Sequence, residues 1–453
     1  MNEKNLIKLD NGETVNLGSY SSIEEAAEDD FSTIPVPKLY RHNWSHIMFV
    51  WFGAAMVAQL YVAGVNLTLN TGGIKNAMLS ILGGILFLGL FVAFNGVIGQ
   101  KTGCGAALSA TYAYGTLGVA IPSFHIADIG WYVVNIAVFS EILHTLIPSI
   151  DIKVFCILLC YLFITNGYVG FNQMVVLNRI AAPILIIVSI IGLYKLSVLT
   201  DGGILALFDK AFPENMSIGA GVTAVIGTWS AGASRSADYF RYAKSVKDTF
   251  LASMIGFVVG FLLCICCGVL WGAYSGTSSI GETLAMLNIV IVGGIMFFVQ
   301  TWTTSEHSSY ITSTSLPLAI NVVTGKKIPR RFIILLCGVI GICISGLDIQ
   351  NYYIPFISFL GAVLPVLGGI VIADYFIMAR IGMHWTGIRD PYSLSVLSNK
   401  IPKFNPCVVP ALIIGVIASL KLNIGIAAVN GILVTMLVYC LSCWIYVSLK
   451  NKN

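Results

Sequence analysis

Charged residues are scarce in this 453-residue chain, at 10% of the total, whereas hydrophobic residues reach 57%. An average soluble domain has about 25% charged residues, so these charges could not cover a water-facing surface, and a soluble enzyme is excluded. The net charge of +4 is small and dispersed, which excludes a nucleic-acid-binding face. The catalytic signatures G-x-S-x-G, H-E-x-x-H and Walker A are all missing. We therefore expect a membrane protein that is not an enzyme.

Long runs without Asp, Glu, Lys or Arg dominate the chain, for example residues 42–74, 251–281 and 422–449. A bilayer core of about 30 Å needs roughly 20 apolar residues per helix. The runs are too long and too uniformly apolar for the alternating strands of a membrane barrel. The sequence predicts an all-α membrane protein with 12 transmembrane helices near 46–70, 76–98, 119–147, 152–167, 171–197, 217–234, 249–273, 284–308, 332–347, 353–378, 405–420 and 423–447.

Most of the 25 Lys and Arg residues fall on one side of these spans if both termini are cytoplasmic. The exceptions are Lys75, Lys153, Lys195, Lys210 and Lys421. The positive-inside rule therefore favours a multi-pass protein of the cell membrane with both termini inside, and we expect a monomer. Residues 1–45 are acidic and polar, which predicts a flexible cytoplasmic tail and not a signal peptide. Residues 384–406 predict a cytoplasmic loop.

Two glycine-containing stretches combine small and polar residues at bilayer depth. They run from Gly53 to Gln59 in helix 1 and from Gly227 to Ser234 in helix 6. Transporters with internal repeats bind their substrates mid-membrane at interrupted helices in matching positions, although small residues equally mark close helix packing without a break. We expect helices 1 and 6 to be broken. The boundaries that follow are 46–200 for a first five-helix repeat, 217–378 for a second, and 405–448 for two added helices.

Helix 3 carries a carboxylate at membrane depth, where a charge is expensive and is a candidate for function. Asp128 lies one helical turn before Trp131, so the two side chains share a face. An aromatic plane beside a hydrogen-bonding group suits a flat, polar heterocycle. Trp229, beside Thr228 in the second glycine-containing stretch, could cover the other face of such a ring, and Gln59 ends the first stretch. We take these five residues as candidates for substrate binding.

Helix 8 contains the densest polar run, from Gln300 through Ser309. The hydroxyls of Thr303 and Thr304, with unwound carbonyls near Gly53 and Met56, would suit Na⁺, which prefers oxygen ligands. Two coupling mechanisms stay open: Na⁺ at this site, or protons loaded through Asp128 and Glu306. A third interpretation is that these hydroxyls bond only to carbonyls of their own helix. We expect no cofactor beyond a coupling ion.

For two further sets of ionisable residues we expect a structural role. Ala-Asp-Tyr-Phe occurs at 237–240 and again at 373–376, at cytoplasmic helix ends. We expect Asp238 and Asp374 to be caps or loop anchors and not ligands. Glu141 and His144 share a face near the outer end of helix 3, and we interpret them as a vestibule pair or a buried hydrogen bond.

The motifs resemble those of one transporter family. Gly-Thr-Trp-Ser-Ala-Gly at 227–232, followed by Ala-Asp-Tyr-Phe-Arg at 237–241, is similar to the sixth helix of cytosine permeases. Trp-Thr-Thr at 302–304 resembles their eighth helix, and the segment 359–375 resembles their tenth. Across roughly residues 35–450, the chain resembles the purine–cytosine permease group of nucleobase–cation symporters.

The resemblance implies an inverted five-plus-five repeat of the leucine-transporter type and a pocket between helices 1, 3, 6, 8 and 10. It implies that Trp131 and Trp229 sandwich the substrate ring. Asp128 stands where cytosine permeases typically have Gln, and Ser305 and Glu306 stand where they have Asn and Asp. Because a carboxylate only accepts hydrogen bonds, Asp128 favours a donor-rich or cationic ring. The Na⁺ site implied by the family pattern uses backbone oxygens near Gly53, Met56 and Gln300 and the hydroxyls of Thr303 and Thr304.

We therefore expect a secondary active symporter that imports a nucleobase or a related heterocycle, either cytosine-like, a purine or an aminopyrimidine, driven by Na⁺ through alternating access. Alternatives are proton coupling, a vitamin-like pyrimidine substrate, and an amine or amino-acid substrate on the same architecture. An alternative from another functional class is a membrane sensor that transports nothing, but such a protein would need a signalling domain.

Overall fold

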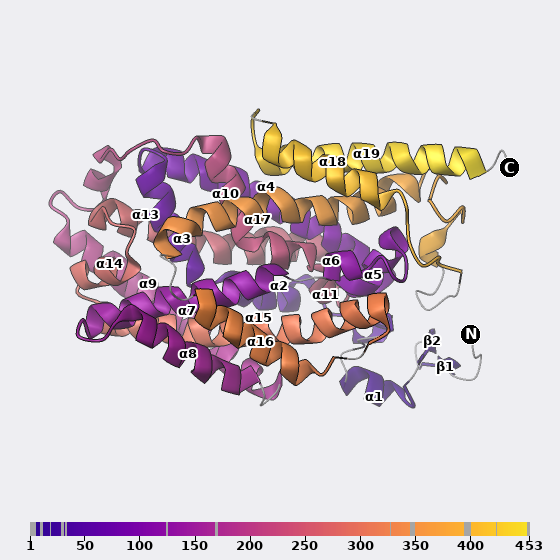
Figure 1. Cartoon of the computed structure of the whole chain (residues 1–453), viewed down its shortest axis with the longest axis horizontal. Coiled ribbons are helices and arrows are strands. Elements are labelled where there is room, and N and C mark those ends of the chain that lie inside the picture. The colour runs from indigo at the N-terminus through magenta and orange to yellow at the C-terminus, as the bar shows by residue number, and fades with distance from the viewer. Residues whose placement is uncertain are drawn as a thin grey trace.

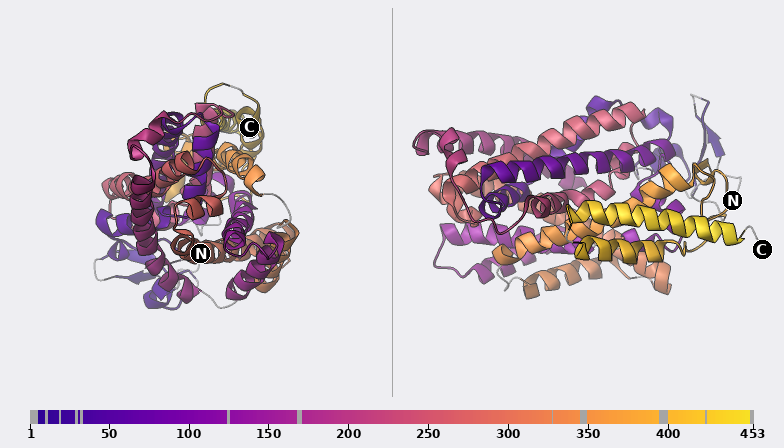
Figure 2. Two further views of the ribbon diagram at one scale, coloured as in Figure 1. Left: turned by 90° about the vertical axis from the view of Figure 1, so that its left-hand side faces the viewer. Right: turned by 90° about the horizontal axis from the view of Figure 1, so that it is seen from above.

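The computed structural model describes residues 6–9, 12–18, 20–28, 31, 34–123, 126–167, 171–326, 328–344, 349–393, 400–422 and 424–450. This part of the chain is almost entirely helical, and most helices run along the long axis of the molecule (Figures 1 and 2). The N-terminal strands and the end of the last helix lie at the same end of the bundle (Figure 1). This end is called the terminal end below.

The long helices share an apolar composition. They are α4 (Ile74–Thr102), α7 (Ile126–Leu146), α8 (Ile152–Gly167), α9 (Phe171–Leu199), α10 (Ile218–Ser234), α13 (Val258–Ser275), α15 (Val290–Thr324), α16 (Arg330–Ile344), α17 (Ile349–Ala373), α18 (Val408–Lys421) and α19 (Ala427–Lys450). Their outer faces carry exposed side chains such as Leu82, Ile190 and Leu437. Continuous exposed apolar surface of this kind is unstable in water and stable against lipid.

Shorter elements connect or extend these helices. They are α1 (Ile23–Glu28), α2 (Trp44–Ala55), α3 (Gln59–Asn70), α5 (Ala106–Tyr114), α6 (Ala120–Ser123), α11 (Ala237–Phe240), α12 (Val246–Leu251) and α14 (Ile280–Met286), the 3₁₀ turns η2 (Lys38–Tyr40), η3 (Ile204–Asp209) and η6 (Pro391–Ser393), and the π-helical turns η4 (Ala252–Phe257) and η5 (Asp374–Met378).

Six helices of the described residues are long and apolar enough to cross a membrane, and a seventh span results if the bent pair α2–α3 is counted as one. Four shorter apolar helices are also present. A total of 12 spans remains a prediction.

The helices pack in two groups. In one group α7, α8, α15 and α16 pack on one another, and in the other α3, α4, α10 and α13 do so. Helix α17 packs along α10, and α18 and α19 pack on each other and on α17. One continuous apolar core includes residues of both groups, for example Phe139 of α7 and Phe261 of α13.

The boundaries of helix 8 differ from the sequence prediction. The predicted span 284–308 contains the end of α14, a turn, and the start of α15, which continues to Thr324. Asn288 has a left-handed backbone with φ of 56°, a conformation that asparagine tolerates better than most residues and that ends a helix. Pro317 lies inside α15 without ending it, as membrane helices allow.

The first 45 residues, which the sequence predicts to be a flexible tail, contain ordered elements. Strands β1 (Leu6–Lys8) and β2 (Thr14–Asn16) form an antiparallel pair. A small apolar cluster includes Leu17, Phe31 and Val36. The backbone N–H of Val36 donates to Gly103 O at 2.8 Å, which attaches this segment to the end of α4. The apolar residues spaced among the acidic ones account for this packing.

Candidate functional site

The first span is interrupted at the level of the predicted site. Helix α2 ends at Ala55 and α3 begins at Gln59, and their axes differ by 60°. Met56, between them, has an extended backbone (φ −81°, ψ 100°). Carbonyl groups in the last turn of α2 therefore lack the N–H partners that a continuous helix would provide. The interruption falls within the stretch from Gly53 to Gln59, where the sequence predicts one.

The predicted break between Gly227 and Ser234 is wrong. Helix α10 runs without interruption to Ser234, and only Arg235 and Ser236 separate it from α11. The glycine serves close packing instead, because a Cβ on Gly227 would lie 1.6 Å from the carbonyl oxygen of Ile357 in α17. Of the two expectations for small residues in a membrane helix, close packing applies here.

Four helices converge where α3 begins. The side-chain amide of Gln59 donates to Asn135 Oδ1 on α7. Thr301 Oγ1 on α15 donates weakly to the carbonyl of Asn135 at 3.5 Å. The hydroxyl of Tyr353 on α17 donates to the backbone carbonyl of Gln59 at 2.9 Å. The interruption therefore faces polar groups from α7, α15 and α17, all buried from solvent.

Asp128 and Trp131 lie one turn apart on α7, as expected, but Asp128 has a partner that the sequence did not reveal. Its carboxylate oxygens receive hydrogen bonds from Arg235 Nη2 at 3.2 Å and Nη1 at 3.3 Å. The Trp131 ring meets Phe356 on α17 edge to face, with centroids 5.3 Å apart. Asp128 is thus part of a buried ion pair beside a half-buried aromatic plane.

Trp229 and Thr228 lie in α10, where their contacts differ from those of Trp131. The Trp229 ring packs on Trp51 of α2, with centroids 6.2 Å apart, and on Phe257, at 5.5 Å. Its buried Nε1 has no hydrogen-bond partner in the part of the chain that the structure describes. The hydroxyl of Thr228 donates to the carbonyl of Val225 at 2.7 Å. Trp131 thus packs against an aromatic ring of α17, and Trp229 packs against one of α2. The two tryptophans belong to different aromatic groups.

The polar run of α15 is directed partly at its own helix. Thr303 Oγ1 and Thr304 Oγ1 donate to the carbonyl of Gln300, at 3.0 and 2.6 Å. Two buried atoms of this run, Gln300 Oε1 and Ser305 Oγ, have no partner among the described residues. The side chain of Glu306 lies outside the described residues. A Cβ on Gly53, near the end of α2, would meet no atom within 4 Å, so this residue borders open space.

A cavity lies among helices toward the terminal end of the bundle. Its lining comes from α4, α5, α6, α7, α10, α11 and α17. Its polar lining residues are Asn95, Ser109, Ser234, Arg235 and Asp238, and its apolar ones include Ala127, Ala231 and Leu364. Arg235 therefore contacts both Asp128 and this cavity.

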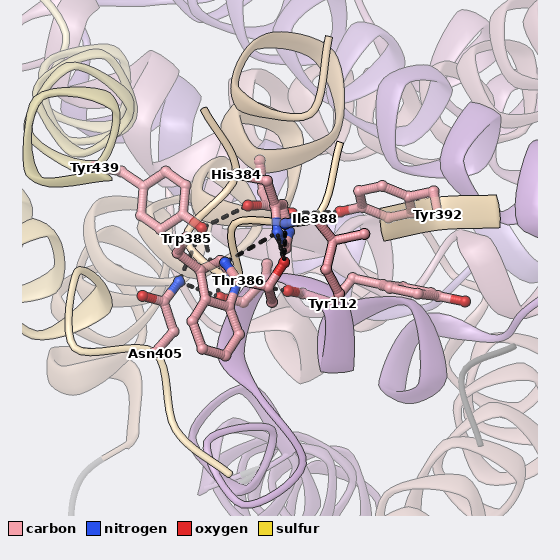
Figure 3. A network of polar contacts seen from close by, with 10 residues as sticks. Tyr112, His384, Trp385, Thr386, Ile388, Tyr392, Asn405 and Tyr439 are labelled. Carbon is pink, nitrogen blue, oxygen red and sulfur yellow. Dashed lines mark hydrogen bonds and ion pairs between the residues drawn. The ribbon is translucent and has the colours of Figure 1, made fainter. Parts of the chain in front are cut away.

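Asp374 and Asp238 are loop anchors, as the repeated motif predicted. The carboxylate of Asp374 accepts hydrogen bonds from the Tyr439 hydroxyl at 2.6 Å, the Tyr392 hydroxyl at 2.7 Å and His384 Nε2 at 3.0 Å (Figure 3). This network ties the segment after α17 to α19 and to the loop that contains η6. Asp238 Oδ1 accepts from the backbone N–H of Ala106 at the start of α5, at 2.8 Å.

Glu141 and His144 also form structural hydrogen bonds. Glu141 Oε1 accepts from the Ser279 hydroxyl and from the backbone N–H of Gly281, at 3.3 Å, at the start of α14. His144 Nδ1 lies 2.7 Å from the carbonyl of Ile150. Glu141 thus holds the start of α14, and His144 holds the turn after α7.

A membrane span that is broken beside buried polar groups from three other helices is typical of transport proteins, because irregular backbone at membrane depth is tolerated where it is buried or lines a cavity. The chain belongs to the family of permeases for cytosine/purines, uracil, thiamine and allantoin, whose profile matches residues 35–447. The resemblance inferred from the motifs is thereby confirmed, and the protein is a multi-pass membrane transporter and not an enzyme.

Relatives of known name agree with this assignment. The chain is 26% identical to the cytosine permease of Escherichia coli (strain K12) over 373 residues, which cover 80% of this chain and 84% of that protein. Its fold is similar to that of Mhp1, a nucleobase-cation-symport-1 family transporter. Against the closed conformation with bromovinylhydantoin bound, the TM-score is 0.69 with 16% identity, covering 92% of this chain and 96% of that one. Against the inward-facing conformation it is 0.71 with 15% identity, covering 91% and 93%.

Proposed function

We propose that the protein is a Na⁺-driven symporter that imports a nucleobase or a related aminopyrimidine into the cell by alternating access. The proposed architecture has 12 spans in an inverted five-plus-five repeat with two added helices, and both termini are cytoplasmic. The broken first span is part of this architecture, whereas α10 is continuous to Ser234, so no second break is proposed within the sixth span.

The convergence of helices on Gln59 and Asn135 is the observation that carries this proposal. A substrate site in a broken-helix transporter needs freed backbone groups next to side chains from several helices. The end of α2, the start of α3, and polar groups of α7, α15 and α17 provide this combination. The relatives that transport cytosine support a heterocyclic substrate for this site.

The hydrogen bonds of Thr303 and Thr304 are compatible with a role as Na⁺ ligands. A hydroxyl that donates its proton to a helix carbonyl keeps its own oxygen lone pairs, which can bind a cation. Gln300 Oε1, which is buried without a partner among the described residues, is a further acceptor. Open space beside Gly53 leaves room for an ion at the end of α2.

The proposed substrate ring lies against Trp131, with Trp229 and Thr228 on the side of α10 and Ser305 on that of α15. Ser305 Oγ is buried and lacks a partner among the described residues, so a ligand that can donate or accept a hydrogen bond would satisfy it. Asp128 is already paired with Arg235, and the two together present acceptors and donors next to the ring.

The test begins with thermal unfolding of the purified protein in detergent, with a panel of cytosine, uracil, adenine, aminopyrimidines and amino acids, with and without NaCl. A ligand that binds the folded state raises the midpoint. Uptake of the best ligand in labelled form is then measured in liposomes, under a Na⁺ gradient and under a choline gradient of the same size.

We expect a nitrogen heterocycle to stabilise the protein and to accumulate only under the Na⁺ gradient. Uptake driven equally well by an inward proton gradient without Na⁺ would replace Na⁺ by proton coupling. Stabilisation by amino acids alone, or the lack of uptake of any base, would refute the proposed substrate class.

A further inference from the structure

The ion pair between Asp128 and Arg235 connects the two packed groups of helices. Asp128 lies in the first turn of α7, which packs with α8, α15 and α16. Arg235 directly follows α10, which packs with α3 and α4. The guanidinium fork binds both carboxylate oxygens, an arrangement that fixes orientation as well as distance. The pair therefore holds the terminal ends of α7 and α10 together.

An apolar layer lies next to the ion pair and extends across the bundle. Ala127, Ala231 and Leu360 form a buried cluster against which Trp131 and Phe356 pack. Ala127 precedes Asp128 in the chain, and the carbonyl of Ala231 accepts a hydrogen bond from Arg235 Nε at 3.3 Å. The ion pair and the apolar cluster thus form one layer that includes residues of α7, α10 and α17.

This layer lies between Trp131 and the cavity at the terminal end. Ala127, Ala231 and Arg235 line the cavity, and Trp131 lies one helical turn farther along α7 from that end. On the far side of the cavity are α5 and α11, which Figure 1 shows toward the terminal end. A molecule passing from Trp131 to the cavity has to cross the layer.

We infer that Asp128 and Arg235 are the lock of a gate at the terminal end, which opens when α10 separates from α7 and the ion pair breaks. This inference rests on the proposed transport function. A charge left alone in an apolar interior is unstable, so the pair favours the closed layer. When the pair breaks, the cavity offers Arg235 a polar surrounding that includes Ser234 and Asp238, which makes opening feasible.

The test measures access to the layer and needs no substrate, so its failure is distinct from failure of the proposed transport function. Ala127→Cys places a thiol where the layer meets the cavity, at a residue that is 5% exposed, and Ala107→Cys places one on the cavity wall in α5, at an exposed residue. The full-length protein in detergent is treated with a water-soluble thiol reagent. The modification rate of each introduced cysteine is followed by mass spectrometry of its peptide, which separates it from the native cysteines.

We expect Arg235→Gln and Asp128→Asn to speed modification at position 127 at least fivefold, with little change at the exposed position 107. The exchange of Asp128→Arg with Arg235→Asp restores the ion pair and should return the rate toward that of the parent. Arg235→Lys keeps the charge but loses the guanidinium fork, so its modification rate at position 127 should lie between those of the parent and of Arg235→Gln. It replaces Arg235→Gln in the test if that variant does not fold.

Equal acceleration at positions 127 and 107 would mean general loosening and would overturn the inference. Unchanged rates in variants that retain the parent's unfolding temperature would overturn it as well.

Discussion

The hydroxyl of Tyr439, in the last helix, donates a 2.6 Å hydrogen bond to the carboxylate of Asp374, at the end of α17. The same hydroxyl accepts a hydrogen bond from Asn405 Nδ2 at 3.0 Å. Asp374 is fully buried, so its charge depends on these donors because water cannot replace them. The position of α19 and of the loop after α17 is thus tied to one carboxylate.

We predict that Tyr439→Phe lowers the free energy of unfolding by about 1.5–3 kcal/mol, the usual range for a hydrogen bond to a charged group. Tyr446→Phe is the matched control, because Tyr446 lies on the same helix and is 38% exposed. Chemical unfolding of both variants in detergent measures the difference. Equal losses in the two variants would show that the bond to Asp374 does not stabilise the fold.

Gly227→Ala should destabilise the protein, although alanine is the better helix former by about 1 kcal/mol. The added Cβ would fall 1.6 Å from the carbonyl oxygen of Ile357, so α10 and α17 would have to separate. We expect a net loss of about 1–3 kcal/mol, as for other overpacked interiors. Gly53→Ala is the control, since no atom lies within 4 Å of its added Cβ, and it should unfold at the parent's temperature or higher.

The two glycine stretches show where sequence reasoning succeeds and where it fails. Both Gly53 and Gly227 lie among small and polar residues at bilayer depth, and the chain is interrupted only after the first. Small side chains permit either a break or a close helix crossing, and the carbonyl of Ile357 that decides the second case is 130 positions away in the sequence. Local composition therefore predicts that such a site is special without predicting which kind it is.

The partner of Asp128 was unpredictable for a similar reason. A carboxylate in a chain with so few charges was a sound candidate, and its position one turn from Trp131 followed from helix geometry. Arg235 is 107 residues away along the chain, and only the fold brings it near. Its position at the end of an apolar helix was the available signal, but the positive-inside rule already accounts for an arginine there. The role of Asp374 was easier to predict, because a repeated motif at helix ends indicated a loop anchor.

Stability should fall on mild acidification because of His42, which precedes α2 outside the spans. Partial burial, the stacked ring of His46 at 4.4 Å and the charge of Lys244 lower the pKa of His42 below its ordinary value of 6.5. At a pH above 6.5, His42 is neutral in both the folded and the unfolded chain. Below this pH the unfolded chain takes up the proton first, so stability decreases until the folded state is also protonated.

The measurement is the thermal unfolding midpoint between pH 8 and pH 5, for the parent and for His42→Asn. We expect a smaller decrease in the variant, and the difference should be small because the His42 side chain is exposed. Identical pH profiles would argue against this role of His42.

Trp131→Ala should weaken binding of the transported base by about 5-fold to 150-fold, since stacking of a base on an aromatic side chain contributes about 1–3 kcal/mol. Trp131→Phe, which keeps a smaller ring, should lose less. Trp444→Ala controls for the loss of a tryptophan at a lipid-facing position, where 54% of the residue is exposed. Ligand-induced thermal shifts measure all three, and an unchanged affinity in Trp131→Ala would exclude stacking on this residue.

Thr304→Ala should weaken the dependence of binding on Na⁺ and leave the fold intact. The variant loses the oxygen that we propose as a Na⁺ ligand, together with a hydrogen bond of 2.6 Å to the carbonyl of Gln300. Thr324→Ala removes a comparable bond, from Oγ1 to the carbonyl of Ile320 at 2.7 Å, near the end of the same helix. The Na⁺ concentration that gives half-maximal stabilisation by the base should therefore rise severalfold in Thr304→Ala and stay constant in Thr324→Ala. Thr304→Ser keeps the hydroxyl and should behave like the parent. A similar rise in both alanine variants would show that only the hydrogen bond within α15 matters, and proton coupling would then become the better explanation of active uptake.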